Sequence, residues 1–280
     1  MIITIIGLGK IGCSLGLALG EKAGNLQRIG HDREIKAAQE AKRVGAIDAY
    51  AINLHQAVQD ADVVFLAVPF DQIRETVQQI AQDLTPGAVV IDLSPAKQKV
   101  SEWMGNLLPP SRYYIGWNLA INPAYLQDTS KGVSAARRDY FYQGVVAVTA
   151  PPGMPAEVYD LMGGLIRRIG AQPLFADMIE MDGVLAEAQV IPQLLSALMV
   201  YTLARQPGWR EARKFAAQDF WEMGLPIAKS TSAAELSHTL SANRETVERL
   251  INDLLTVLVE WREQIHNGEV EGLTQSLLDA

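Results

Sequence analysis

Three glycines near the start of the chain have the spacing of a turn that can hold a phosphate group. Residues 7–12 have the sequence Gly-Leu-Gly-Lys-Ile-Gly, between an apolar run and a stretch with helical spacing. Glycines at these positions permit a tight turn, a close approach of the backbone to a pyrophosphate, and close packing of helix on strand. The N-terminus of the following helix favours negative charge. We therefore expect a dinucleotide cofactor to contact Gly7, Gly9, Lys10, Ile11 and Gly12.

A carboxylate at the end of the next predicted strand indicates which dinucleotide binds. Asp32 follows Gly12 by 20 residues, a separation at which an acidic side chain accepts hydrogen bonds from the adenosine ribose of NAD. Its charge would repel the 2′-phosphate of NADP. Arg33 could bind that phosphate instead, although a solvated surface position is the simpler role for it. NAD is the expected cofactor, and NADP is possible.

Two later strand ends belong to the same predicted site. Val68 and Pro69 follow one apolar run, and Ser94 follows another. An open α/β sheet binds its ligand at the carboxyl ends of its strands. We therefore expect all three residues to contact the cofactor.

Three residues could act directly in a reaction at these strand ends. Lys97 could donate or accept a proton beside a nicotinamide if its pKa is lowered, and its alternative role is an ion pair with Asp92 or a helix end. Asn118 can orient a carbonyl or carboxylate oxygen but cannot transfer a proton, and it could equally cap a loop. Glu187 could be a base if it is buried, whereas a solvated face is the commoner position for a glutamate.

An arginine pair and the histidines bear on the substrate and on metals. Arg137 and Arg138 lie late in a long loop, where they could hold a carboxylate or a phosphate, or simply be exposed. The four histidines do not have the spacing of metal ligands, so we expect no metal.

The elements that position these residues alternate between strands and helices in the first part of the chain. Strands are expected within residues 1–7, 26–32, 60–69, 87–94, 142–151 and 171–176, with helical spacing between most of them. A further strand is expected to carry Tyr114 and Ile115, with a loop over the nicotinamide end of the site beginning after it. Because these runs are apolar on both faces, they predict a mostly parallel sheet covered on two sides. The fold class is therefore α/β, a Rossmann-type doubly wound sheet.

From Met178 onward the pattern is almost wholly helical, so we predict two domains, 1–176 for the dinucleotide and 177–280 as a helical domain. The apolar segment 190–204 is shorter than the ~20 residues that a membrane span needs. It contains Pro192 and Gln193, and a helix buried in a protein interface is expected instead.

Composition excludes some classes of partner. The net charge of -8 and the scattered basic residues argue against nucleic acid. Cys13 is the single cysteine of the chain, which rules out an internal disulfide and fits a reducing cytoplasm.

These segments together resemble the prephenate/arogenate dehydrogenase family of the 6-phosphogluconate dehydrogenase-like superfamily. The resemblance is carried by "IGLGKIGCSLGLAL", "VVFLAVP", the pair Asp92 and Lys97, "AVTAPP", a helix with an internal proline at Pro192, and "SANRETVERLIND". It implies an NAD-dependent oxidation and decarboxylation of a cyclohexadienol in tyrosine biosynthesis. It also implies that the helical domain is a dimerisation domain, so the expected protein is a cytoplasmic homodimer.

The chain departs from the family at the positions that the resemblance assigns to chemistry. Pro95 stands where the family has a serine, with Ser94 one residue early. Trp117 and Asn118 replace a glycine and a histidine, and the larger indole is expected to narrow the pocket. Gln189 and Val190 replace a serine and a histidine before Pro192, and Trp221 replaces an arginine that holds substrate. We accordingly assign Trp117, Arg137, Arg138, Gln189 and Trp221 to the substrate.

These replacements change the chemistry that is available. Histidine can accept a hydroxyl proton near neutral pH and valine cannot, while arginine can hold a carboxylate and tryptophan cannot. The expected function is an NAD(P)-dependent dehydrogenase acting on a small acidic hydroxy compound that need not be prephenate. The alternatives are a non-catalytic NAD-binding sensor or assembly protein, and an ordinary prephenate dehydrogenase. The last is weakened because no histidine lies between His55 and His238.

Overall fold

The chain divides into two compact units. The computed structural model describes residues 1–20, 25–229 and 232–279. One unit comprises Met1–Leu185 with Lys229–Thr239, and the other comprises Ala186–Ala228 with Leu240–Ala280. We expected the domain boundary between residues 176 and 177, and the chain does change there from strands to helices. The position of the domain boundary itself stays a prediction.

Among the residues that the structure describes, a single sheet of eight strands forms the centre of the first unit. Its order is β3-β2-β1-β4-β5-β6-β7-β8. All neighbouring pairs are parallel except β6 and β7, which confirms the predicted mostly parallel sheet. The strands are β1 (Ile2–Ile6), β2 (Gln27–His31), β3 (Ala49–Tyr50), β4 (Val63–Leu66), β5 (Val89–Asp92), β6 (Tyr113–Leu119), β7 (Val145–Thr149) and β8 (Gln172–Phe175).

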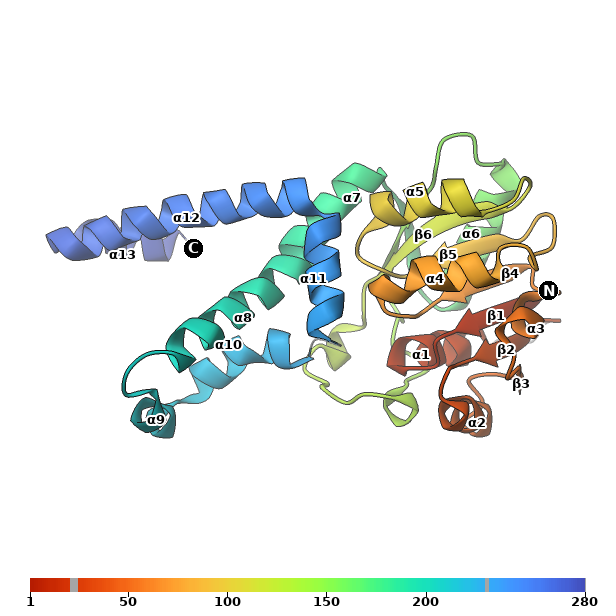
Figure 1. Ribbon diagram of the computed structural model, residues 1–280, viewed down its shortest axis with the longest axis horizontal. Helices are drawn as coiled ribbons and strands as arrows, with labels where there is room; N and C mark the ends of the chain where they lie inside the picture. The colour runs from red at the N-terminus through yellow and green to blue at the C-terminus, as the bar shows by residue number, and fades with distance from the viewer. Residues whose placement is uncertain (21–24, 230–231, 280) are drawn as a thin grey trace. The chain divides into compact units, whose positions relative to one another are not determined.

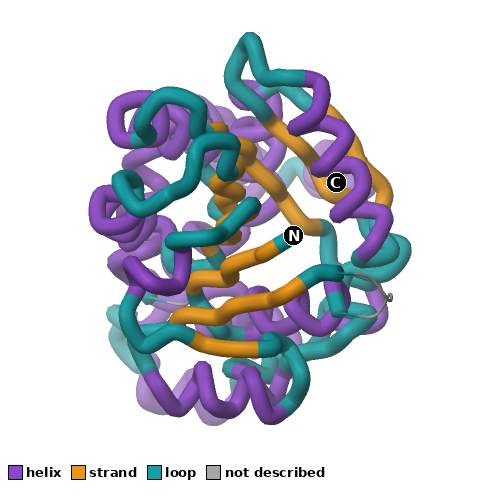
Figure 2. The backbone as a smooth tube through the Cα atoms, turned by 90° about the vertical axis from the view of Figure 1, so that its right-hand side faces the viewer, coloured by secondary structure: helices purple, strands orange, loops and turns teal. Residues whose placement is uncertain are grey.

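Helices cover both faces of this sheet, as Figures 1 and 2 show. One face carries α1 (Lys10–Leu19), α2 (Ile35–Arg43) and α6 (Ala156–Arg168), whose buried residues share one apolar core with the strands. The helices α3 (Leu54–Val58), α4 (Phe70–Ile80) and α5 (Lys97–Leu107) pack in sequence beside one another, and α7 (Met178–Leu185) packs on α5. Two short 3-10 turns, η1 (Pro123–Tyr125) and η2 (Val133–Ala135), lie between β6 and β7.

Strand β6 is longer than its sequence pattern predicts. We expected the chain to leave the sheet after Ile115, but Gly116 pairs with Asp92 of β5 and the ladder with β7 runs to Leu119. Because side chains alternate along a strand, Ile115 and Trp117 share one face, while Gly116 and Asn118 share the other. This alternation decides the positions of the candidate site residues.

The second unit is helical, as predicted from Met178 onward. A π turn, η3 (Ala186–Val190), precedes α8. Pro192 lacks the N–H that a regular helix would need at this point. The remaining helices are α8 (Ile191–Ala204), α9 (Trp209–Ala212), η4 (Arg213–Phe215), α10 (Gln218–Lys229), α11 (Ala233–Ala242), α12 (Arg244–Asn267) and α13 (Val270–Leu278), of which α10 ends and α11 begins in the first unit.

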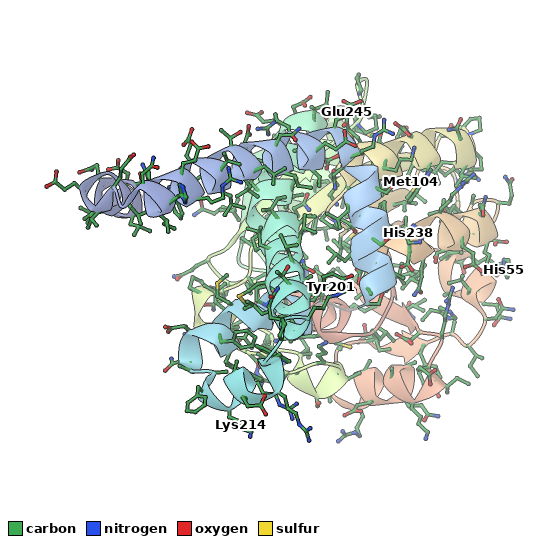
Figure 3. The ribbon with its side chains drawn as sticks, turned by 60° about the vertical axis from the view of Figure 1, so that its left-hand side comes forward. His55, Met104, Tyr201, Lys214, His238 and Glu245 are labelled. Atoms are coloured by element: carbon green, nitrogen blue, oxygen red, sulfur yellow. The ribbon has the colours of Figure 1, made fainter. Side chains whose placement is uncertain are left out.

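Many large apolar side chains of the second unit are exposed in the single chain. Tyr201 of α8, labelled in Figure 3, is 62% exposed, and Trp221 of α10 is 68% exposed. By length and composition alone, Met178–Ala204 is a helix that could cross a membrane, with 28% of its most apolar window buried. A single helix of this kind is weak evidence. The helix begins at Met178 and not at residue 190, so the prediction that this segment is too short for a membrane span was wrong.

Candidate active site at the carboxyl ends of the strands

The glycine turn between β1 and α1 has the shape that a dinucleotide requires. Gly7 has φ +94°, and a Cβ there would lie 2.5 Å from the carbonyl oxygen of Ala67. A Cβ on Gly12 would overlap the carbonyl oxygen of Gly7. Around a Cβ on Gly9, by contrast, no described atom lies within 4 Å. Gly7 and Gly12 are thus required by packing, whereas Gly9 leaves an open backbone surface that fits a pyrophosphate.

Asp32 is fixed beside this turn by two backbone donors. Its Oδ2 accepts the N–H of Leu8 at 2.7 Å, and its Oδ1 accepts the N–H of Glu34 at 2.8 Å. Each carboxylate oxygen keeps a further lone pair for a ribose hydroxyl. Arg33 forms an ion pair with Glu75 at 3.5 Å, and both side chains are 62% exposed. This geometry favours the solvated role for Arg33.

The other predicted cofactor contacts occupy the neighbouring strand ends. The close approach of Gly7 to Ala67 brings the end of β4 against the glycine turn. Val68 and Pro69 are half-buried there, and Pro69 is the N-cap residue of α4. In the glycine turn, Lys10 is half-buried and Ile11 is 47% exposed. The turn thus lies at the switch between β1 and β4, where ligands of open α/β sheets bind.

Lys97 is fully buried in a network of charged and polar groups. Its Nζ donates to Asp92 Oδ2 at 2.8 Å, to the Asp92 carbonyl at 2.9 Å and to the Trp117 carbonyl at 3.0 Å. Burial lowers the pKa of the ammonium, and the charge of Asp92 opposes that shift. Three donated protons and no exposed surface leave Lys97 nothing to offer a substrate in this conformation. The geometry therefore favours the ion-pair alternative, in which Lys97 positions the ends of β5 and β6.

Sequence analysis missed two members of this network. Tyr114 is buried and its hydroxyl donates to Asp92 Oδ2 at 3.1 Å; burial raises its pKa well above 10. Asp182 of α7 accepts the N–H of Lys97 at 2.6 Å and of Gln98 at 2.9 Å, which caps the start of α5. Burial raises the pKa of Asp182, and these two hydrogen bonds oppose the rise. The available signal for it was an aspartate between apolar residues in "MIEMDGVL", a stretch that also contains Glu180.

Asn118 and Ser94 present unpartnered polar atoms at the ends of β6 and β5. The Asn118 Nδ2 donates to the Ser94 carbonyl at 3.1 Å. The Asn118 Oδ1 and the Ser94 Oγ are both buried and have no hydrogen-bond partner among the described residues. Such atoms carry a desolvation cost until they are paired. Asn118 Oδ1 is therefore an available acceptor, while Nδ2 already donates to a carbonyl of the protein, and the orienting role of Asn118 stays a prediction.

Trp117 corrects another expectation. Its side chain is fully buried in the core on the α1 and α6 side of the sheet, with its ring centroid 5.2 Å from that of Phe65. The indole consequently packs in the core and does not narrow a pocket beside Asn118. The error arose because we expected β6 to end at Ile115. Residue 117 was then placed in a loop, where the alternation of side chains between the two faces of a strand does not apply.

The loop arginines and the residues of the second unit have ordinary local surroundings. The Arg137 guanidinium donates to the carbonyls of Ser134 and Ala136, and Arg138 is exposed. In the second unit Gln189 and Trp221 are exposed. Glu187 is exposed as well, and its Oε1 lies 3.6 Å from a guanidinium nitrogen of Arg249. A solvated and paired carboxylate is the commoner of the two roles weighed for Glu187.

The fold and the glycine turn define the class of this protein as a Rossmann-type dinucleotide-binding protein with an added helical unit. Residues 15–172, more than half of the chain, match the family described as "Prephenate dehydrogenase, nucleotide-binding domain". The chain belongs to the prephenate dehydrogenase family of oxidoreductases.

Named relatives support this membership. The chain is 27% identical over 252 residues to a prephenate dehydrogenase of Lactococcus lactis, covering 89% of this chain and 67% of the relative. It is 22% identical over 273 residues to a prephenate dehydrogenase of Bacillus subtilis, covering 97% and 72%.

Solved structures share the fold over the whole chain. Prephenate dehydrogenase from A. aeolicus, in complex with hydroxyphenyl propionate and NAD+, superposes with a TM-score of 0.86 at 19% identity, covering 100% of this chain and 95% of that one. Synechocystis arogenate dehydrogenase gives a TM-score of 0.78 at 20% identity, covering 100% and 97%.

Proposed function

We propose that the protein is an NAD-dependent dehydrogenase of the prephenate/arogenate type that oxidises a small acidic hydroxy compound other than prephenate. Membership of the family supports the reaction class. The observation that carries the change of substrate is the pair of unpartnered buried atoms, Ser94 Oγ and Asn118 Oδ1, at the ends of β5 and β6.

NAD is the cofactor that the turn and its carboxylate fit best. The backbone of residues 7–12 would hold the pyrophosphate at the start of α1, and the free lone pairs of Asp32 would accept from the ribose hydroxyls. The charge of Asp32 disfavours the 2′-phosphate of NADP. Bound NAD supplies the hydride acceptor, and a relative from A. aeolicus is known with NAD+.

Asn118 and Ser94 would orient the substrate hydroxyl. A hydroxyl can donate to Asn118 Oδ1 while it accepts from Ser94 Oγ, which satisfies both orphan atoms at once. A carboxylate placed there would repel the amide oxygen. Neither side chain titrates near neutral pH, so neither is the base.

The decisive assay follows NADH formation over prephenate, arogenate and a panel of small hydroxy acids. We expect turnover of a hydroxy acid with NAD, slower turnover with NADP, and poor turnover of prephenate. Ordinary rates with prephenate would overturn the proposed change of substrate and leave an ordinary prephenate dehydrogenase.

A second candidate is an NAD-binding protein without redox chemistry. One observation favours it: the Lys97 ammonium already donates three hydrogen bonds within the protein. Lys97 was a candidate acid or base, and in this conformation it has no proton to offer a substrate. Tight NAD binding by calorimetry with no reduction across the panel would support it. Any substrate whose turnover is lowered by Asn118→Ala would exclude it.

We also propose that the helical unit forms a homodimer in the cytoplasm. Leu198, Tyr201, Phe215, Trp221 and Leu258 are each more than half exposed in the single chain. A partner copy would bury such apolar surface. Light scattering should give a dimer, and Trp221→Asp should weaken it; a wild-type monomer at micromolar concentration would contradict the proposal.

A further inference from the structure

The loop between β6 and β7 is held against the helix that follows the glycine turn. Its ends meet where the Ala120 N–H donates to the Val145 carbonyl at 2.9 Å. Within it, Val133 and Ala135 are buried and η2 packs on α1. The Arg137 N–H donates to Ser14 Oγ of α1 at 3.0 Å. The loop is therefore attached to the first helix by packing and by a hydrogen bond.

A partly buried ion pair makes a second attachment at the start of α1. The Nζ of Lys10, the first residue of the helix, lies 3.2 Å from Asp128 Oδ2 and donates to the Asp128 carbonyl at 3.2 Å. The ammonium also lies 4.9 Å from the centroid of the Tyr140 ring. The side chains of Lys10 and Asp128 are only 13% and 24% exposed. Lys10 is thus satisfied by the loop alone.

Asp128 is kept ionised in this position by its own loop. Its Oδ1 accepts the N–H and the hydroxyl of Ser130. These two hydrogen bonds, followed by Lys10, lower the pKa of the Asp128 carboxyl. A permanent negative charge therefore lies beside the first turn of α1, where no described side chain caps the helix and no acidic residue is present in the first turn.

We propose that Asp128 competes with the cofactor pyrophosphate for Lys10, so that dinucleotide binding breaks the ion pair and loosens the loop. This inference rests on the proposed cofactor. The pyrophosphate would bind at the first turn of α1, within the segment that holds Lys10, and the Asp128 carboxylate both repels it and occupies the cation. The pair thereby couples cofactor binding to the loop that follows Asn118.

Calorimetric titrations with ADP, NAD and adenosine test this competition, because adenosine lacks the phosphates. We expect Asp128→Asn to tighten ADP and NAD about 3- to 10-fold and to leave adenosine unchanged, since a 1.4 kcal/mol change in binding is tenfold. Lys10→Met should weaken ADP and NAD by a similar factor. In the Lys10→Met background, Asp128→Asn should tighten ADP and NAD by a smaller factor than in the wild type, because only the repulsion of the pyrophosphate is then removed. Asp139→Asn is a matched control, because that carboxylate lies in the same loop but accepts from Tyr125.

Hydrogen exchange supplies a readout that is independent of affinity. Amides of residues 126–132 should exchange faster in the wild type when ADP is bound, and equally fast with and without ADP in Asp128→Asn. If Asp128→Asn still binds NAD but has the same ratio of ADP to adenosine affinity as the wild type, the proposed competition is overturned and the proposed cofactor is not. If neither NAD nor ADP binds the wild type, the proposed cofactor fails and the competition fails with it.

Discussion

Gly116 of β6 makes room for Lys97. A Cβ on Gly116 would lie 2.6 Å from Cδ of the Lys97 side chain and 2.5 Å from Oγ1 of Thr149. Strand β6 therefore places its one glycine where the lysine stem passes toward Asp92. Gly116 thus leaves space for the buried charge network, and its neighbour Trp117 packs in the apolar core.

Gly116→Ala should destabilise the protein by about 1–3 kcal/mol, because an added methyl in a filled interior forces its neighbours to shift. Gly105→Ala is the matched control: Gly105 lies in α5, and no described atom lies within 4 Å of a Cβ added there. That control should raise stability by about 0.5–1 kcal/mol, since alanine favours a helix. Urea unfolding followed by circular dichroism measures both, and equal effects of the two variants would contradict the packing role.

Removing either partner of the buried ion pair should be more damaging. Lys97→Met or Asp92→Asn leaves a charge or a polar group uncompensated, so each should cost about 3–5 kcal/mol. The double variant should cost less than the sum of the two, because it buries no unpaired charge. A Lys97→Met protein of wild-type stability in urea would show that the ammonium is not held as described.

The parts of the fold around the candidate site that sequence analysis predicted correctly are those encoded by neighbouring residues. The glycine turn and the strand before it form a local pattern, and the alternation of strands and helices predicts the sheet. Asp182 and Asp128 were missed because their partners lie 85 and 118 residues away in the chain. Nothing in the local sequence specifies such pairings, and only the assembled sheet brings them together.

Trp117 shows how a small error in an element boundary changes a functional interpretation. A loop tryptophan beside Asn118 would be expected in the pocket, but in a strand the same two residues face opposite sides. The extra four residues of β6 thus moved Trp117 from the predicted site to the core.

Asn118→Ala should lower kcat/KM for the true substrate about 10- to 100-fold, the usual cost of losing one well-placed hydrogen bond at a reacting group. The pH dependence of kcat/KM should keep its shape, because asparagine does not titrate. Asn118→His should instead add a titration near pH 6–7. Initial rates from pH 5 to 9 distinguish these outcomes, and a lost titration in Asn118→Ala would contradict an orienting role.

Asp32→Asn should reduce the preference for NAD over NADP about tenfold or more, because the 2′-phosphate no longer meets a negative charge. The ratio of the two dissociation constants, measured by fluorescence titration, is insensitive to any shared loss of stability. Arg33→Met is the comparison, and it should leave NAD binding nearly unchanged since Arg33 is exposed beside Glu75. An equal change of the ratio in both variants would be inconsistent with these assignments.

Cys13 should resist alkylation in the folded protein. Burial raises the pKa of its thiol to about 12, and the charges of Asp32 and Glu40 add to the rise. Because this pKa is above the unfolded value of 9.0, the stability that it contributes is present below pH 9 and is lost as the pH rises from 9 to 12. Mass spectrometry after iodoacetamide treatment at pH 9 should find Cys13 unmodified in buffer and modified in urea; rapid modification of the folded protein would refute its burial.

The hydrogen bond that joins Ala120 to Val145 has a consequence for how this protein can change over evolutionary time. It makes the segment between β6 and β7 a closed loop whose ends the sheet holds together. The entropy of closing such a loop varies slowly with length, by about 0.6 kcal/mol for each doubling. Insertions and deletions around residues 126–132 should therefore be tolerated, and a lineage could acquire or lose Asp128 while its sheet stays intact.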